Sequence, residues 1–132
     1  PRNPLPPGHN PLRTAELLNS RADKIIACRG NCDAEVDQMV LNFPLMADYC
    51  LLVDEGRKIF ITHGHIWSLE RFPHLAAGDL FLFGHIHTQI LEQNSDGVII
   101  CNPGSISLPK DNSPAGYAVY DSGAVALVSL ER

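Results

Sequence analysis

Hydrophobic residues recur along this chain with two different spacings, and each spacing predicts a different kind of element. Apolar residues return every three or four positions in residues 12–21, which predicts a helix. Residues 33–43 are also typical of a helix, with Asp33 as the N-cap, acids in the first turn and Pro44 at the end. Residues 1–11 hold five prolines and read as a loop.

Shorter apolar runs predict strands. Residues 24–30 and 80–84 each read as a short buried strand that ends at a glycine. Glycine-containing turns separate the other runs, which predicts three hairpins. The hairpins would pair residues 49–54 with 58–63, 88–93 with 98–102, and 116–121 with 124–130. Because helices and strands alternate first and hairpins follow, we predict an α/β fold with a mixed sheet and helices outside it.

Length and charge limit the function classes. The 132 residues predict one domain over residues 1–132, large enough for its own core. A net charge of -5 argues against a nucleic-acid binder or an anionic-membrane binder. A small phosphorylated substrate stays compatible, because a bound metal can supply positive charge locally. No run approaches the roughly 18 apolar residues of a membrane span, and no secretory signal pattern opens the chain.

Cysteine usage indicates the compartment. The chain has four cysteines and no visible pairing framework; they are Cys28, Cys32, Cys50 and Cys101. Three of them lie in apolar runs, as buried free thiols do. We therefore expect a reducing, cytoplasmic environment.

Polar residues follow three of the predicted strands. They form the groups Asn31-Cys32-Asp33, His63-Gly64-His65 and His85-Ile86-His87. Ligands of open α/β sheets collect at the carboxyl ends of strands. A glycine beside each group lets the backbone turn sharply and leaves room for an ion.

The two histidines at 85 and 87 carry a further expectation. Residues two apart on a strand point to the same side, so both imidazoles would face one pocket. Each could then serve one of two metal ions about 3.5–4 Å apart. Imidazole suits Zn, Mn, Fe and Ni, and an amide oxygen such as that of Asn31 suits the harder of these ions.

Blander interpretations remain beside this one. Isolated histidines such as His9 and His74 are typical of structural or surface residues. A zinc site from Cys28 and Cys32 is an alternative, although their spacing is not the usual short knuckle. Cys32 could also be a nucleophile, because it precedes a predicted helix N-terminus.

Taken together and in this order, the motifs resemble the calcineurin-like metallophosphoesterases, and most closely the small YfcE-type bacterial phosphodiesterases of that family. They are Gly30-Asn31-Cys32-Asp33, Thr62-His63-Gly64-His65, Gly84-His85-Ile86-His87 and Asn102-Pro103-Gly104-Ser105. The resemblance runs essentially from residue 1 to the end. It implies a four-layer α/β/β/α sandwich and hydrolysis of a small phosphodiester by a hydroxide held between two divalent metals, with Mn as the expected ion and Fe, Zn or Ni as alternatives.

The resemblance also implies a role for each matching residue. Asn31, His63 and His85 would bind the second metal, and His87 the first. Cys32 and His65 would take the catalytic positions at the phosphate, His65 by contacting substrate or orienting a ligand. Arg29 reads as a solvated or salt-bridged residue, with substrate phosphate contact as its other role. Asn102 and Ser105 would shape the loop beneath the site.

Two departures from the family pattern matter. The family usually has histidine where Cys32 stands, and a thiol is a weak donor, so we expect a preference for diesters with good leaving groups. The family's Asp-x-His motif does not occur here, and no strand ends in Gly-Asp. These motifs would supply the bridging aspartate and two ligands of the first metal.

We therefore expect an N-terminally truncated domain, lacking a strand–helix–strand unit of about 30 residues or more. As written, it should bind at most one ion weakly and should not turn over. The exposed sheet edge would be covered by that unit or by a neighbouring chain in a homo-oligomer. The rival hypothesis is a metal-poor interaction scaffold of the same fold, of the retromer-subunit type.

Overall fold

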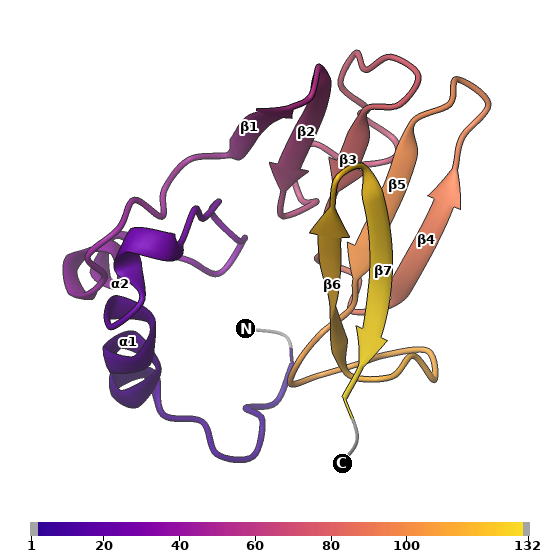
Figure 1. Ribbon diagram of the computed structural model, residues 1–132. Helices are drawn as coiled ribbons and strands as arrows, with labels where there is room; N and C mark the ends of the chain where they lie inside the picture. Colours follow the sequence, from indigo (N-terminus) through magenta and orange to yellow (C-terminus); the bar gives the residue numbers. More distant parts are fainter. Residues whose placement is uncertain (1–2, 131–132) are drawn as a thin grey trace.

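The computed structural model describes residues 3–130, which form two β-sheets with the α-helices grouped to one side (Figure 1). The helices are α1 (Pro11–Asn19), the 3₁₀ turn η1 (Ala22–Lys24) and α2 (Glu35–Val40). The strands are β1 (Tyr49–Asp54), β2 (Arg57–Thr62), β3 (Leu80–Leu82), β4 (Gln89–Gln93), β5 (Ile99–Pro103), β6 (Gly116–Asp121) and β7 (Ala124–Ser129).

Helix α1 confirms the helix predicted for residues 12–21, although it begins one residue earlier and ends two residues earlier. Its start is well defined, because the side chain of Asn10 accepts a hydrogen bond from the Arg13 N–H at 3.1 Å. Pro11 occupies the first turn, where its missing N–H costs nothing.

Helix α2 is shorter than predicted, and both of its expected ends were wrong. Its N-cap is Ala34, because the Asp33 carboxylate instead accepts the Gly30 N–H at 2.7 Å. It ends at Val40 rather than at Pro44 because Asn19 of α1 captures the backbone there. The Asn19 amide donates to the Val40 carbonyl at 2.7 Å and accepts from the next free N–H, that of Asn42, at 2.7 Å. A contact 23 residues away along the chain thus ends the helix.

The buried strand predicted for residues 24–30 is also wrong. These residues contain the end of η1 and then an extended segment that pairs with no strand of residues 3–130. Ile26 in it is 63% exposed. One backbone hydrogen bond, from the Arg29 N–H to the Ala47 carbonyl at 2.7 Å, ties the segment to the chain before β1. Strand character depends on a neighbouring strand, which the local sequence cannot reveal.

The larger sheet has the order β1-β2-β3-β5-β4, and it is mixed as predicted. β2, β3 and β5 run parallel, while β1 and β4 pair antiparallel with their hairpin partners. The third predicted hairpin forms the second sheet, β6-β7. In Figure 1 this hairpin lies in front of β3 and β5, and contacts between β5 and β6 support that placement. The three predicted hairpins and the mixed α/β class are confirmed, and the two sheets provide the β layers of the predicted sandwich.

The core is built on the central parallel strands. Phe60, Phe81, Phe83, Val98 and Ile100 form one buried cluster. Phe60 and Phe81 stack with ring centroids 5.9 Å apart. This packing fixes β2 and β3 side by side, so the residues that follow both strands leave the sheet at the same edge.

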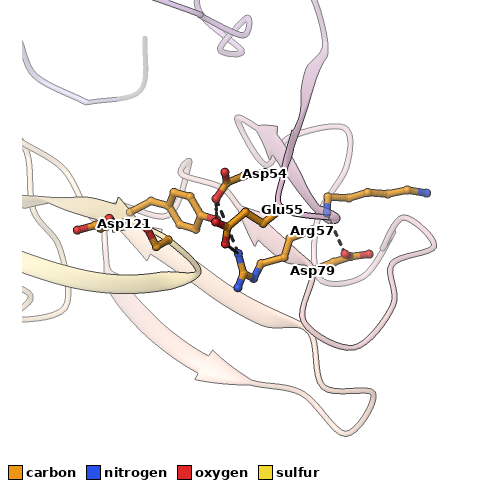
Figure 2. A network of polar contacts seen from close by, with 8 residues as sticks. Asp54, Glu55, Arg57, Asp79 and Asp121 are labelled. Atoms are coloured by element: carbon orange, nitrogen blue, oxygen red, sulfur yellow. Dashed lines mark hydrogen bonds and ion pairs between the residues drawn. The ribbon is translucent and has the colours of Figure 1, made fainter.

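A polar network joins the β1–β2 turn to the β6–β7 hairpin (Figure 2). It lies at the other end of the strands from the edge where the residues that follow β2 and β3 leave the sheet. The Tyr120 hydroxyl donates to the Asp54 carboxylate at 2.5 Å. Arg57 lies 3.4 Å from the Glu55 carboxylate. Asp79 accepts the Lys58 N–H at 2.9 Å, which fastens the chain before β3 to β2. The network therefore ties the two sheets together.

No helix in residues 3–130 is long and apolar enough to span a bilayer.

Candidate active site

The loops that follow β2 and β3 meet at the carboxyl edge of the large sheet. The Gly84 N–H donates to the His63 carbonyl at 2.7 Å, which joins the two loops directly. Gly64 has φ +116°, and a Cβ there would come within 3.2 Å of the Gly84 carbonyl oxygen. Only glycine fits this close approach without displacing its neighbours.

Three of the predicted ligands come together here. The Asn31 Oδ1 atom lies 2.8 Å from His63 Nε2, and the same nitrogen lies 3.2 Å from His85 Nδ1. Two donor atoms bound to one ion at about 2.0–2.2 Å would lie roughly 2.8–3.6 Å apart. The spacing of these three atoms therefore fits ligands that share one cation.

Ligation by imidazole requires a neutral ring. Burial, and then the nearby His85 and His65, lower the pKa of His63 to about 4. Burial, and then the nearby Arg29, lower the pKa of His65 as well. Both rings therefore keep their lone pairs near neutral pH. In residues 3–130 no group of three or more His, Cys, Asp or Glu side chains has a metal-binding arrangement, and the third donor here is an amide.

His65 carries the clearest sign of an absent partner. Both of its ring nitrogens are buried and make no hydrogen bond within the described part of the chain. Leaving one buried polar group unsatisfied costs about 1–3 kcal/mol, so such groups call for an explanation. Its ring centroid lies 5.3 Å from that of His63, beside the three ligand atoms. The orphaned imidazole and the ligand spacing both fit a site that holds an ion and an anionic substrate.

His87 lies outside the group of three. Its Nδ1 atom is 2.8 Å from the Leu108 carbonyl oxygen, to which only an N–H can donate. This contact leaves Nε2 as the lone-pair nitrogen, an orientation common among metal-binding histidines. The predicted role of His87 at a first metal stays a prediction.

His85 and His87 were predicted to face one pocket because both were placed on a strand, and that placement was wrong. β3 ends at Leu82, so both histidines lie in a loop and the alternation of a strand does not apply. Their φ angles are +72° and +61°, in the left-handed region that side chains rarely adopt. Strained backbone of this kind costs of order 1–3 kcal/mol and clusters at functional sites.

Buried Asn102, at the end of β5, supports this loop. Its side-chain amide donates to the Gly84 carbonyl at 3.0 Å, immediately before His85. Its oxygen accepts the Gly104 N–H at 2.9 Å. The Ser105 hydroxyl accepts the Leu108 N–H at 2.9 Å, which holds the carbonyl that His87 contacts. Of the two predicted loop-shaping positions, Asn102 contacts the histidine loop directly, and Ser105 contacts Leu108, which in turn contacts His87.

The histidines line an open cleft of about 940 Å³. Cys32 lines it and is exposed, as its predicted place at the substrate requires. Arg29 is absent from the lining and instead forms a salt bridge with Asp48 at 2.8 Å. Sequence reasoning missed four parts of the wall, namely residues 3–6, His9, Leu108 and Lys110. The run Leu-Pro-Lys after the Asn-Pro-Gly-Ser motif could have pointed to the last two.

The cysteine alternatives gain no support. Cys28 and Cys32 both line the cleft but form no group with a third metal ligand among residues 3–130. Burial, and then the nearby Cys50, raise the pKa of the Cys28 thiol, which disfavours the thiolate that zinc needs. His74 is exposed and lies outside the cleft, as expected of a surface histidine, whereas His9 is also exposed but lines the cleft.

Comparison with known proteins identifies the class. Residues 9–124 match the calcineurin-like phosphoesterase superfamily domain. The match covers most of the chain, so the chain belongs to the calcineurin-like phosphoesterase family, a family of enzymes. The resemblance read from the motifs is confirmed.

The individual relatives are phosphoesterases as well. Phosphodiesterase YfcE of Escherichia coli K12 is 43% identical over 130 residues, which is 98% of this chain and 70% of YfcE. The solved structure of YfcE aligns over the same shares of the two chains with a TM-score of 0.94 and 42% identity. The probable metallophosphoesterase YsnB of Bacillus subtilis strain 168 is 33% identical over 102 residues, which is 69% of this chain and 53% of YsnB.

Proposed function

We propose that this chain carries part of the active site of a divalent-metal-dependent phosphodiesterase. The observation that carries the proposal is the convergence of Asn31, His63 and His85 at ligand spacing beside the orphaned ring of His65. Its high identity to a phosphodiesterase supports the same substrate class.

The residues present fit one ion well. Asn31, His63 and His85 would hold it, and His87 would contribute to a second. An amide oxygen beside two imidazoles favours Mn²⁺, with Fe, Zn or Ni as alternatives. The Asp-x-His motif is absent from these 132 residues, so the proposal covers only the ligands named here. Divalent ions at such a site supply Lewis-acid stabilisation of phosphoryl oxygens and a nucleophile near neutral pH.

The chain's own side chains would do the remaining work. Neutral His65 can present one N–H and one lone pair to the phosphate, which would satisfy both of its unpaired nitrogens. Cys32 lines the cleft at the position where the family usually has histidine, a stronger hydrogen-bond donor that would assist the leaving group. Because a thiol donates weakly, substrates with good leaving groups should react best.

The surroundings fit a small, soluble-phase substrate. The net charge of -5 disfavours nucleic acid or an anionic membrane as partner. The free cysteines suit a cytoplasmic enzyme. An open β1 edge would be compatible with a homo-oligomer.

The test is hydrolysis of bis(p-nitrophenyl) phosphate by the protein expressed from its natural gene, with Mn²⁺ and with EDTA. Mn²⁺-dependent hydrolysis that disappears in His85→Ala supports the proposal. The matched control is His74→Ala, because His74 is an exposed histidine outside the cleft. Equal rates in wild type and His85→Ala would overturn it. Absence of both Mn²⁺ binding and hydrolysis would favour the scaffold hypothesis instead.

A further inference from the structure

Lys110 is the only lysine or arginine that lines the cleft within residues 3–130. The ion pairs in this part of the chain involve Arg29 and Arg57, and none involves Lys110. An ammonium group beside a site for an anionic substrate, with no carboxylate partner, is free to bind an anion.

The backbone of Lys110 is held against a predicted metal ligand. Its N–H donates to the His87 carbonyl at 3.0 Å, while the His87 ring contacts the Leu108 carbonyl at 2.8 Å. Two contacts two residues apart therefore fasten this segment to the histidine loop. The Lys110 backbone cannot move away from the cleft wall without breaking its hydrogen bond to His87.

The residues after Lys110 make further hydrogen bonds that hold this segment in place. The Ser113 N–H donates to the Lys110 carbonyl at 2.9 Å, and the Ser113 hydroxyl accepts the Gln89 N–H at 2.8 Å. Asp111, the acid next in sequence, is engaged by the Thr88 hydroxyl at 3.3 Å. The neighbouring carboxylate is thus turned to another partner, and the lysine stays available.

The cleft that Lys110 lines also carries apolar surface. Leu5 and Ile86 line the cleft and are 63% and 42% exposed. Leu108 lines it as well. Exposed apolar side chains in the same cleft as a cation suit a substrate with an anionic centre and an apolar ester arm.

We propose that Lys110 is a substrate-binding residue that contacts the phosphate of a phosphodiester whose ester arm is aromatic or otherwise apolar. The proposal rests on the proposed function. It assigns to Lys110 the phosphate contact that the sequence had suggested for Arg29. Lysine acts as a flexible point charge, and its attraction is felt by bound substrate and transition state alike. Such uniform binding affects KM rather than kcat.

The experiment compares wild type, Lys110→Gln and Lys110→Arg with bis(p-nitrophenyl) phosphate at low and high salt. Lys110→Gln should raise KM about three- to tenfold, with kcat changed less than about twofold, as for the loss of one partly exposed charge contact. Added salt should raise KM less in Lys110→Gln than in wild type. Lys110→Arg should restore KM, and Lys24→Gln, an exposed lysine of η1, should match wild type.

A binding measurement separates this proposal from the proposed function. Calorimetric titration with inorganic phosphate, with and without Mn²⁺, should show weaker binding to Lys110→Gln than to wild type. If the protein bound phosphate through Lys110 but hydrolysed no diester, the proposed function would be contradicted and the contact between Lys110 and phosphate would be supported. Unchanged KM and unchanged phosphate affinity in Lys110→Gln, in an active enzyme, would overturn the contact alone. A wild type that binds no phosphate and hydrolyses no diester would overturn both.

Discussion

The two ends of strands β2 and β3 carry polar residues of opposite character. At the amino ends, Asp79 is only 7% exposed, yet its carboxylate accepts the Lys58 N–H and the Ala76 N–H, each at 2.9 Å. Figure 2 shows Asp79 with the Asp54, Glu55 and Arg57 contacts of the same edge. The polar groups there have partners within the chain.

At the carboxyl ends, three of the histidines either lack partners or have strained backbone. Both nitrogens of His65 are unpaired, and His85 and His87 have left-handed backbone. Unsatisfied and strained groups reduce stability, and the packed core beneath them compensates. The contrast indicates that one edge contributes to stability and the other to function, and each edge can be tested by mutation.

Removing a proposed ligand should have the largest effect. His63→Ala should lower kcat/KM at least about 100-fold, because even the loss of an outer partner of a ligand costs about 10–100-fold. The melting temperature of the metal-free protein should fall less than in Asp79→Ala, because the His63 ring is only half-buried and its polar contacts are with the candidate ligands Asn31 and His85. Steady-state kinetics and thermal unfolding with EDTA check this. A large fall in melting temperature would show that the site edge is structural.

Asn102 links the two kinds of region. Asn102→Asp would place a carboxylate against the Gly84 carbonyl in a fully buried position, which should cost about 1–3 kcal/mol of unfolding free energy. Because the Gly84 peptide leads into His85, Mn²⁺ affinity should also fall about tenfold. Urea unfolding and calorimetry measure the two effects.

Asn94→Asp is the matched control. Its Oδ1 accepts the Asp96 and Val98 N–H groups, each at 3.0 Å, in a turn away from the cleft, and aspartate keeps that acceptor. A change in metal affinity equal to that of Asn102→Asp would refute the positioning role.

Mutation of Asp79 should have the reverse effect of mutation of His63, because it should lower stability and leave activity nearly unchanged. Asp79→Ala leaves the Lys58 and Ala76 N–H groups without their acceptor, so unfolding free energy should fall by about 2–3 kcal/mol. The kcat of the remaining folded enzyme should stay within about twofold of wild type, an effect below about 0.5 kcal/mol. A selective loss of kcat with unchanged stability would break the comparison.

The pH dependence of stability should separate the edges as well. With EDTA present, the folded-state pKa of His63, about 4, lies below its usual value near 6.5. The unfolded chain therefore binds more protons between these values, and stability falls as pH drops through that window.

For Asp79, burial raises the pKa, but the N–H groups of Ala76 and Lys58 outweigh it and lower the pKa below its usual value. Its contribution is lost only at lower pH, below about 3.8. In His63→Gln, the loss of stability between pH 6.5 and about pH 4 should be smaller, and the loss below about pH 3.8 should be unchanged. Urea unfolding from pH 7 to pH 3 tests this, and a His63→Gln curve parallel to wild type would be the contrary result.

The smallest effect is expected from Tyr120→Phe. It removes the hydroxyl that donates to Asp54 across the two sheets, on a partly exposed surface. The melting temperature should fall slightly, and less than in Asp79→Ala, with no change in kcat. Differential scanning calorimetry is sufficient.

What the sequence predicted well depended on short-range rules. Glu55-Gly56 and Ser122-Gly123 define hairpin turns, with Gly56 and Gly123 at φ +80° and +91°. The ligand candidates were chosen because β2 ends directly before His63 and the family motifs lie in order, and their role as ligands stays a prediction. Asn31 and His63 meet 2.8 Å apart although 32 residues separate them.

What the sequence missed depended on long-range contacts. The end of α2 is set by Asn19, and the failed strand at 24–30 lacks a neighbour in residues 3–130. The His85 and His87 conformations depend on Gly84, held by Asn102, and on the Leu108 carbonyl. The Lys110 backbone N–H donates to the His87 carbonyl, which holds Lys110 at the cleft, and no local sequence pattern indicates this contact.

The central claim is that Asn31, His63 and His85 share one divalent ion. Calorimetric titration of the metal-free protein with Mn²⁺, for wild type, His85→Ala and His74→Ala, tests it most directly. The account predicts Mn²⁺ binding by wild type and His74→Ala, with affinity at least about tenfold weaker in His85→Ala. Equal Mn²⁺ affinity in wild type and His85→Ala, or no binding by wild type, would contradict it.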